Sequence, residues 1–119
     1  MSNSQVHVHV GETMEEVGTR FVDGWHRMER GEDVSEKHIS FETLETMVRV
    51  LSPKRLELLR HVHQSPAKNI RVLALALGRN YRRVYEDVEA LEAAGLLDRD
   101  KEGLRAEYEA FDVAMRVAL

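Results

Sequence analysis

Positive charge is concentrated in the middle of this 119-residue chain, in residues whose type and spacing suit contact with a polyanion. Arg79, Arg82 and Arg83 lie close together, and Tyr81 and Tyr85 are interleaved with them. A guanidinium group donates hydrogen bonds to phosphate oxygens or, as a planar fork, to the edge of a guanine base. The cluster therefore indicates a nucleic acid as the partner.

The charge of the whole chain hides this feature, because the net charge is −4. Residues 49–83 hold nine basic side chains and one acid, Glu57, a net charge of +8, whereas residues 1–48 and 84–119 each carry four basic and ten acidic side chains, a net charge of −6. Such segregation predicts a basic surface on an acidic body. The open alternative is that these charges scatter over the folded surface.

Composition limits the class of protein and the kinds of functional site that the chain can form. A chain of 119 residues with 43% hydrophobic and 32% charged residues is the size and type of one globular domain. It holds no apolar run long enough to cross a bilayer, and its start lacks the pattern of a secretory signal, so we expect a cytoplasmic protein without membrane contact. The absence of cysteine excludes disulfides, thiolate metal sites and cysteine nucleophiles.

Local patterns predict a strand and a helix near the N-terminus. Residues 5–10 alternate valine with polar side chains, which is typical of a strand with one buried face. Thr13 can cap a following amphipathic helix that ends near Gly31. Residues 37–41 fit either a short strand or an extended linker.

Three helices are expected before the cationic cluster. The first spans about 44–51, and Ser52 with Pro53 ends it and begins the second. In the second helix the side chains expected to face inward are Leu56, Leu59 and Val62. Asn69 can then cap a short helix at 70–77.

A turn at Gly78 leads into the helix that carries the cluster. Asn80 can cap this helix, whose inward face is formed by Val84, Val88 and Leu91 until Gly95 ends it, and small Ala74 allows close packing with the helix before it. Two short helices joined by a glycine turn are typical of a helix-turn-helix, in which the second helix enters the major groove and its first residues contact bases.

Strands are predicted after the helices. Residues 96–106 read as a hairpin with a glycine turn, which in this place is a wing. Residues 111–119 alternate apolar and other side chains as a strand does, and we expect this strand to pair with the one at 5–10, in the same chain or across a dimer.

These residues resemble a known family. The run LALALGRNYRRVYEDVEALEAAGLLDRDKEG is similar to the winged helix-turn-helix of MarR-like and related small transcriptional regulators. The preceding FETLETMVRVLSPKRLELLRHV resembles the lead-in of a group of predicted archaeal and bacterial regulators, some of them antitoxin-like. The resemblance covers roughly residues 40–105 and implies a mainly α winged helix-turn-helix over 41–106. The local patterns add a strand and helix over 1–40, which the family pattern does not explain, and a C-terminal strand over 107–119, and the length indicates a single domain 1–119.

The function implied is a sequence-specific regulator of transcription, expected to be a repressor, that binds double-stranded DNA as a homodimer. The expected base contacts are Arg82, Arg83, Tyr85 and Tyr81. The expected phosphate contacts are Lys54, Arg55, Lys68, Arg71, Arg79 and Asn80. The wing carries Arg99, Lys101 and Arg105, which nearby acids offset, so we expect only a weak wing contact.

Other functions are weighed against this one. His7 with His9, and His61 with His63, are His-x-His pairs, but no further ligand is fixed by spacing, so we expect no metal and no other cofactor. No nucleophile, base and orienting group can be assembled by motif, so we expect no enzyme and no catalytic residue. Two alternatives stay open, a winged-helix interaction module or antitoxin that binds a protein partner, and an RNA binder.

Overall fold

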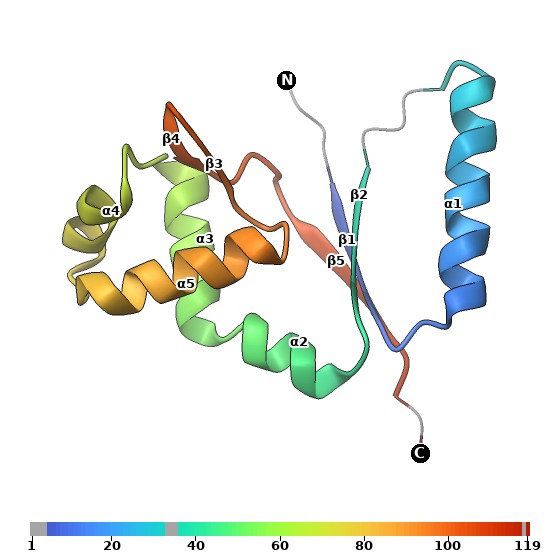
Figure 1. Ribbon diagram of the computed structural model, residues 1–119, viewed down its shortest axis with the longest axis horizontal. Coiled ribbons are helices and arrows are strands. Elements are labelled where there is room, and N and C mark those ends of the chain that lie inside the picture. The colour runs from blue at the N-terminus through green and yellow to red at the C-terminus, as the bar shows by residue number, and fades with distance from the viewer. Residues whose placement is uncertain (1–4, 33–35, 118) are drawn as a thin grey trace. The chain divides into compact units, whose positions relative to one another are not determined.

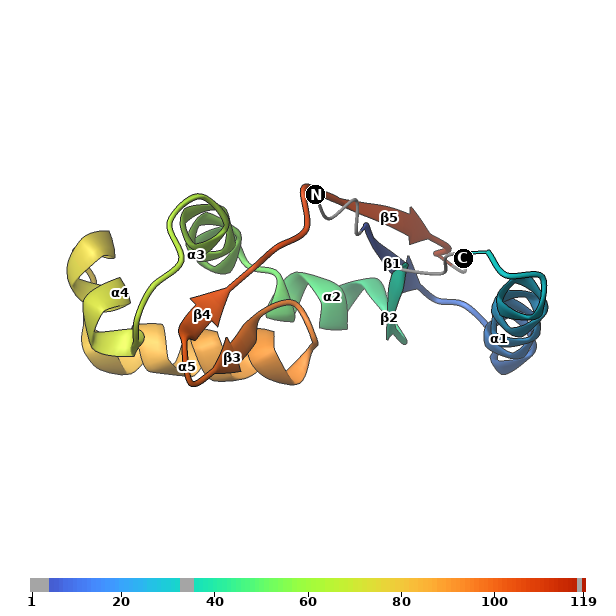
Figure 2. The same cartoon turned by 90° about the horizontal axis from the view of Figure 1, so that it is seen from above.

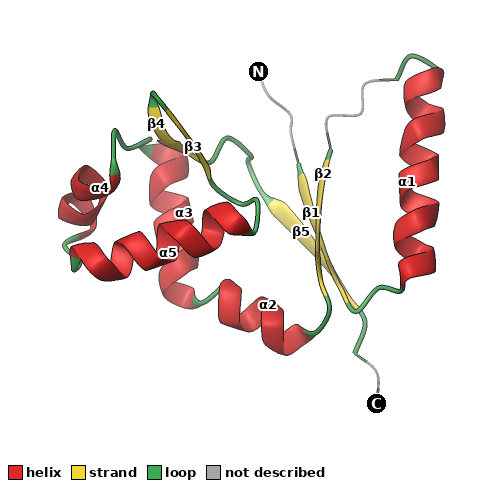
Figure 3. Cartoon of the chain, viewed as in Figure 1, coloured by secondary structure: helices red, strands yellow, loops and turns green. Residues whose placement is uncertain are grey.

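The computed structural model describes residues 5–32, 36–117 and 119, and it shows a mixed α/β chain rich in helix (Figures 1 and 3). Its elements in chain order are β1 (Val6–Val10), α1 (Met14–Glu29), β2 (Lys37–Phe41), α2 (Leu44–Val50), α3 (Pro53–Gln64), α4 (Ile70–Leu77), α5 (Tyr81–Ala93), β3 (Asp98–Asp100), β4 (Gly103–Arg105) and β5 (Phe111–Met115).

The chain forms two compact units. Unit 1 combines Met1–Met47 with Tyr108–Leu119, and unit 2 is Val48–Glu107. The sequence predicts one domain with an extension at each end, whereas here the two ends belong to a unit of their own. Residues 1–4 and 33–35 of the predicted N-terminal extension, and residue 118 of the predicted C-terminal strand, lie outside the described residues.

Unit 1 is built on a three-stranded parallel sheet with β1 in the centre, in the order β2-β1-β5. Val8 of β1 is in register with Ile39 of β2 and with Val113 of β5. Side chains in register on parallel strands lie on the same face of the sheet. The valines of β1 therefore share one face with the apolar side chains of β2 and β5. The valines of β1 are at most 2% exposed, as the alternating sequence predicts.

Helix α1 connects the parallel strands β1 and β2, and Figures 1 and 2 show it on one side of the sheet. Its start is fixed by Thr13, whose hydroxyl accepts a hydrogen bond from the backbone N–H of Glu16 at 3.1 Å, the predicted cap. Residues 37–41, which fit a strand or a linker on sequence alone, form a strand because β1 supplies their hydrogen-bonding partner.

The C-terminal strand β5 pairs with β1 of the same chain, which decides between the two partners expected from the sequence. It is shorter than predicted, since the alternation of residues 111–119 continues past Met115 but the strand does not. The strand ends where its partner ends, because Met115 is in register with Val10, the last residue of β1.

Unit 2 contains three helices whose predicted caps are all present. The side-chain oxygens of Ser52, Asn69 and Asn80 each accept a hydrogen bond from a backbone N–H in the first turn of α3, α4 and α5. The core lies between these helices and includes Val84, Val88 and Leu91, all fully buried.

One position of this core differs from the sequence-based expectation. Leu58 is fully buried, while Leu56, predicted to face inward, is only half-buried. Leu59 and Val62 are buried as predicted. A helix stripe that includes Leu58, Leu59 and Val62 has the spacing of i, i+1 and i+4, so the buried face is turned toward Leu58.

Strands β3 and β4 form the predicted hairpin, and the segment before α4 adds a bridge to it. Ala67 and Leu104 exchange two backbone hydrogen bonds, at 3.2 and 2.7 Å. The approach is so close that a Cβ built on Gly103 would lie 2.2 Å from the carbonyl oxygen of Ala67, and the φ of Gly103 is +130°. Only glycine fits this position without strain.

Candidate nucleic-acid interface

The amino end of α5 is fixed by the turn that precedes it. Gly78 adopts the left-handed conformation at φ 64°, and the backbone N–H groups of Gly78 and Arg79 donate to carbonyl oxygens of the last turn of α4. Asn80 Oδ1 then accepts from the backbone N–H of Arg82 at 2.9 Å and of Arg83 at 3.3 Å. The predicted phosphate contact Asn80 thus uses its side-chain oxygen to start the helix.

The predicted base-contacting residues lie exposed on the first turns of α5. The side chain of Arg82 is 86% exposed, and the ion pair that it makes among the described residues is an exposed one with Glu86, at 3.5 Å. Arg83 is exposed as well. Tyr81 and Tyr85 are about half exposed, and their rings stack with centroids 6.3 Å apart. The helix therefore presents two cations beside a pair of aromatic rings.

Two of the predicted phosphate contacts are engaged inside the unit. Arg55 Nε donates to Asp87 Oδ1 at 3.0 Å, and an amino group of Arg79 donates to Asp87 Oδ2 at 2.8 Å. The side chains of Arg55, Arg79 and Asp87 are only 21%, 19% and 13% exposed. Because both guanidinium groups point to Asp87 and away from solvent, we assign them to holding α5 against α3 and remove them from the phosphate contacts.

The other predicted phosphate contacts are exposed. No ion pair within the described residues involves Lys68 or Arg71. Both line a hollow of about 460 Å³ at the start of α4, together with Tyr81, Tyr85 and Arg99. Lys54 lies apart from this hollow, on α3, 3.7 Å from Glu57 in an exposed pair. The structure thus brings Lys68 and Arg71 beside the tyrosines of α5.

The arginines of the hairpin are neutralised locally. Arg99 donates to Glu89 and Glu92 at 2.8 and 2.7 Å, and these hydrogen bonds raise the pKa of Arg99. Arg105 donates to Asp100, which lowers the pKa of that carboxyl. Lys101, at the tip, is exposed. The hairpin therefore offers one unpaired cation, Lys101.

The comparisons with known proteins concern this same part of the chain. A sequence model of the family HVO_A0114 matches residues 50–113, which is 64 of the 119 residues. The chain belongs to the HVO_A0114 family. The HVO_A0114 region contains α3, α4, α5 and the hairpin, and it ends inside β5. No curated protein and no solved structure matches the chain.

Asp87, which lies within the HVO_A0114 region, is the residue of this site whose role the sequence reasoning missed. It lies three residues after Val84 and four before Leu91, on the inward face of α5. An acid at a buried helix position requires a cationic partner. That spacing was the available signal.

A second polar cluster lies outside the HVO_A0114 region, on the sheet of unit 1. His9 Nε2 lies 2.9 Å from His38 Nδ1, and the ring of His7 stacks on that of His38. Within the described residues, no group of three or more histidines and carboxylates is arranged to hold a metal ion. Of the helices that the structure describes, none combines the length and apolar character needed to cross a membrane.

Proposed function

We propose that this protein is a sequence-specific, double-stranded DNA-binding regulator of transcription, and that α5 enters the major groove by its amino end. The observation that carries the proposal is the exposure of Arg82 and Arg83 in the first turn of α5. The helix itself is held in place by Asp87, whose carboxylate is paired with two other arginines. A recognition helix contacts base edges mainly with its first residues.

The arrangement of unit 2 supports a winged helix-turn-helix. Helices α4 and α5 are joined by three residues, 78–80, and the hairpin follows α5. The bridge between Ala67 and Leu104 adds the segment before α4 to this hairpin as a third, single-residue strand. The element order of helix, short strand, two helices and hairpin is that of the winged helix the sequence resembles.

In the proposed complex the contacts divide into two groups. Lys68, Arg71 and Lys101 neutralise phosphates and set the register, which supplies affinity that depends on salt but not on sequence. Arg82 and Arg83 donate to base edges, and a guanidinium fork on guanine contributes about 1–3 kcal/mol of discrimination. Tyr85 and Tyr81 flank them.

The pair of ion pairs at Asp87 has a positioning role in this mechanism. These two ion pairs join α5 to Arg55 of α3 and to Arg79 of the preceding turn, and so fix the orientation of α5 within unit 2. A helix held in this way does not have to be ordered when DNA binds, which spares part of the entropic cost of association.

We propose further that the regulator is a cytoplasmic repressor that acts as a homodimer. Two copies of α5 about 34 Å apart would read successive major-groove faces of one operator. A repressor of this kind requires no cofactor and no chemical step.

Selection of bound fragments from a random pool of double-stranded DNA, repeated at two ionic strengths, tests the proposal. We expect the same enriched sequence motif at both ionic strengths, with much weaker binding at the higher ionic strength. Absence of any salt-sensitive binding would overturn the assignment. Preference for structured RNA in a parallel pool, or a stable protein partner without DNA affinity, would instead favour an RNA binder or an interaction module such as an antitoxin.

A further inference from the structure

Helix α1 of unit 1 presents a large apolar face that the described residues of its own chain leave uncovered. None of its sixteen residues is buried. Phe21 is 71% exposed and Trp25 is 55% exposed, and Met14 and Met28 are more than half exposed. A continuous exposed patch of aromatic and methionine side chains marks a surface that meets a partner.

The same face carries two glycines in the interior of the helix. Glycine in a helix costs about 0.5–1 kcal/mol relative to alanine. A Cβ built on Gly18 or on Gly24 would meet nothing within 4 Å, and neither residue has a positive φ. Nothing within the described chain therefore explains why these two positions lack a side chain.

The face has a symmetrical arrangement about Phe21. Reading outward from this residue in both directions, the equidistant pairs are Gly18 with Gly24, Val17 with Trp25, and Met14 with Met28. Glycines and large apolar side chains therefore follow one another in the same order toward either end of the helix. In a two-fold interface each residue i meets residue j while j meets i, so an antiparallel pair centred on Phe21 brings together side chains of the same kind: glycine with glycine and methionine with methionine.

We propose that α1 pairs antiparallel with α1 of a second copy of this chain, around a two-fold axis at Phe21. The aromatic ring of each Phe21 fills the space above Gly18 and Gly24 of the partner's helix, as a knob fills a hole. The four large side chains Met14, Phe21, Trp25 and Met28 expose on the order of 500 Å² per protomer, most of the ~800 Å² that each partner buries in a standard interface.

Charge favours the antiparallel direction. The acidic side chains Glu15 and Glu16 lie in the first turn of α1, and the basic side chains His26 and Arg27 lie in its last turn. Glu29 also lies in the last turn and offsets Arg27, so an antiparallel pair places the acidic end of each helix beside a nearly neutral end of the other. A parallel pair would place like charges together and align the two helix dipoles unfavourably.

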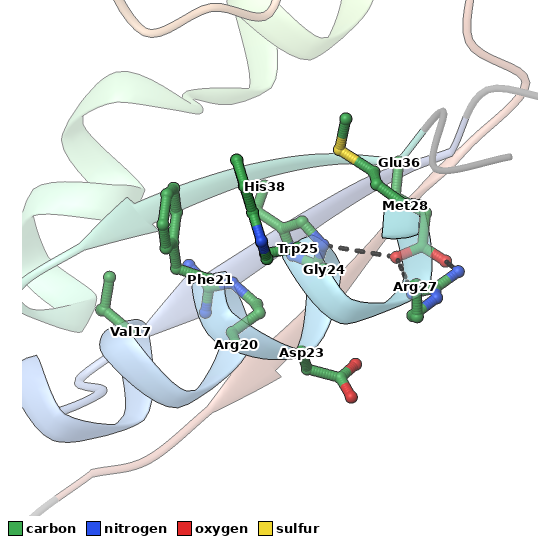
Figure 4. A pocket seen from close by; sticks show the side chains of 10 residues that line it. All are labelled: Val17, Arg20, Phe21, Asp23, Gly24, Trp25, Arg27, Met28, Glu36 and His38. Carbon is green, nitrogen blue, oxygen red and sulfur yellow. Dashed lines mark hydrogen bonds and ion pairs between the residues drawn. The ribbon is translucent and has the colours of Figure 1, made fainter. Parts of the chain in front are cut away.

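The sheet leaves this face accessible. Phe21, Trp25 and Met28 form one wall of an open hollow of about 480 Å³, and His38 and Glu36 form the opposite wall (Figure 4). The hollow separates α1 from β2 along its apolar face. The inference concerns unit 1 alone and does not depend on the proposed DNA contacts, which belong to unit 2.

Sedimentation of the full chain without DNA tests the proposal. We expect a dimer, and we expect Phe21→Gln and Gly24→Gln each to raise the dimer dissociation constant by about tenfold or more. Gly24→Gln is informative because glutamine favours a helix more than glycine does, so helical circular dichroism is retained while association is lost. The matched control is Leu75→Gln, which removes an equally exposed leucine, 77% exposed, from unit 2 and leaves the dimer unchanged.

Single cysteines test the geometry, since the chain has none of its own. Under mild oxidation Phe21→Cys should form a disulfide-linked dimer, and Met14→Cys mixed with Met28→Cys should form the mixed dimer. Met14→Cys alone should not, because its two copies lie about 21 Å apart along the axis at ~1.5 Å per residue. A monomer at high concentration, as expected if the hollow serves a small molecule, or rapid cross-linking of Met14→Cys alone, would overturn the proposal.

Discussion

At the scale of single residues, the site depends on which arginines are free and which are held. Sequence reasoning assigns both Arg82 and Arg79 to DNA, the first to bases and the second to phosphates, because nothing local indicates that Arg79 is paired within the protein. The structure separates them through Asp87, which is 32 residues from Arg55 in sequence. A held arginine positions the helix, whereas a free arginine is available to a ligand.

The ion pairs of Asp87 should therefore contribute to stability. Asp87→Ala leaves two largely buried guanidinium groups without their acceptor, and we expect it to lower the free energy of unfolding by about 1–3 kcal/mol. Urea denaturation measures the change. Glu86→Ala is the matched control, because Glu86 is 60% exposed and its loss should change the free energy of unfolding by less than about 0.5 kcal/mol. Equal effects of the two substitutions would contradict the structural role of Asp87.

The histidines of unit 1 should make stability depend on pH. Burial, aided by the nearby charge of Arg20, lowers the pKa of His9 and His38 below the usual 6.5. The unfolded chain then binds protons more readily than the folded one, so the free energy of unfolding falls as pH is lowered through 6.5 toward the folded pKa values. In addition, protonation of both rings removes the acceptor of the hydrogen bond between them.

Thermal unfolding at a series of pH values between about 5 and 8 measures this dependence. We expect the loss of stability in acid to be smaller in His9→Gln and in His38→Gln than in the wild type. Glu12 contributes in a lower window. Burial alone would raise its pKa, but hydrogen bonds from Arg20 and Ser40 bring it below 4.5, so its contribution is lost only in stronger acid. Unchanged pH profiles in both histidine variants would refute the linkage.

At the scale of elements, the close approach of the hairpin to the segment before α4 can be tested with glycine. Gly103→Ala forces a Cβ to within 2.2 Å of the Ala67 carbonyl oxygen, and we expect it to lower the free energy of unfolding by more than about 2 kcal/mol. Gly78→Ala is matched, since Gly78 also has a positive φ but open space around it, and should cost about 1 kcal/mol. A smaller loss in Gly103→Ala than in Gly78→Ala would contradict the packing described.

The elements themselves were largely predictable, because their signals are local. The caps Thr13, Ser52, Asn69 and Asn80 and the turn at Gly78 each depend on residues within one helical turn. What the sequence could not decide is non-local. The choice of β5 as a partner of β1 in the same chain joins residues about 105 positions apart, and no short pattern encodes it.

At the scale of the whole molecule, the two units differ in charge. Unit 2 holds twelve basic and nine acidic side chains, a net charge of +3, while unit 1 holds five basic and twelve acidic, a net charge of −7. The sequence predicted this segregation in outline. If unit 2 binds DNA as proposed, the acidic unit attached to it limits non-specific attachment, because its net charge repels phosphate.

The dependence of DNA affinity on salt should reflect the few free cations of unit 2. If Lys68, Arg71 and Lys101 each neutralise one phosphate, the slope of log affinity against log salt is about −2.7 per protomer, at ~−0.9 for each phosphate. Titrations of a selected DNA duplex at several salt concentrations measure the slope. A slope near −4.5, which five neutralised phosphates give at ~−0.9 each, would mean that Arg55 and Arg79 leave Asp87 on binding, contrary to the role assigned to them.

The most direct test of the central claim, that the amino end of α5 reads DNA, is the affinity of Arg82→Ala for the selected duplex, measured by fluorescence anisotropy. Arg82 is 86% exposed, so its loss should leave the thermal stability unchanged while weakening specific binding by about 1–3 kcal/mol, or roughly 5- to 150-fold. Arg30→Ala, which removes a paired arginine that is 61% exposed from unit 1, should bind as the wild type does. Wild-type affinity and unchanged sequence preference in Arg82→Ala would contradict the account.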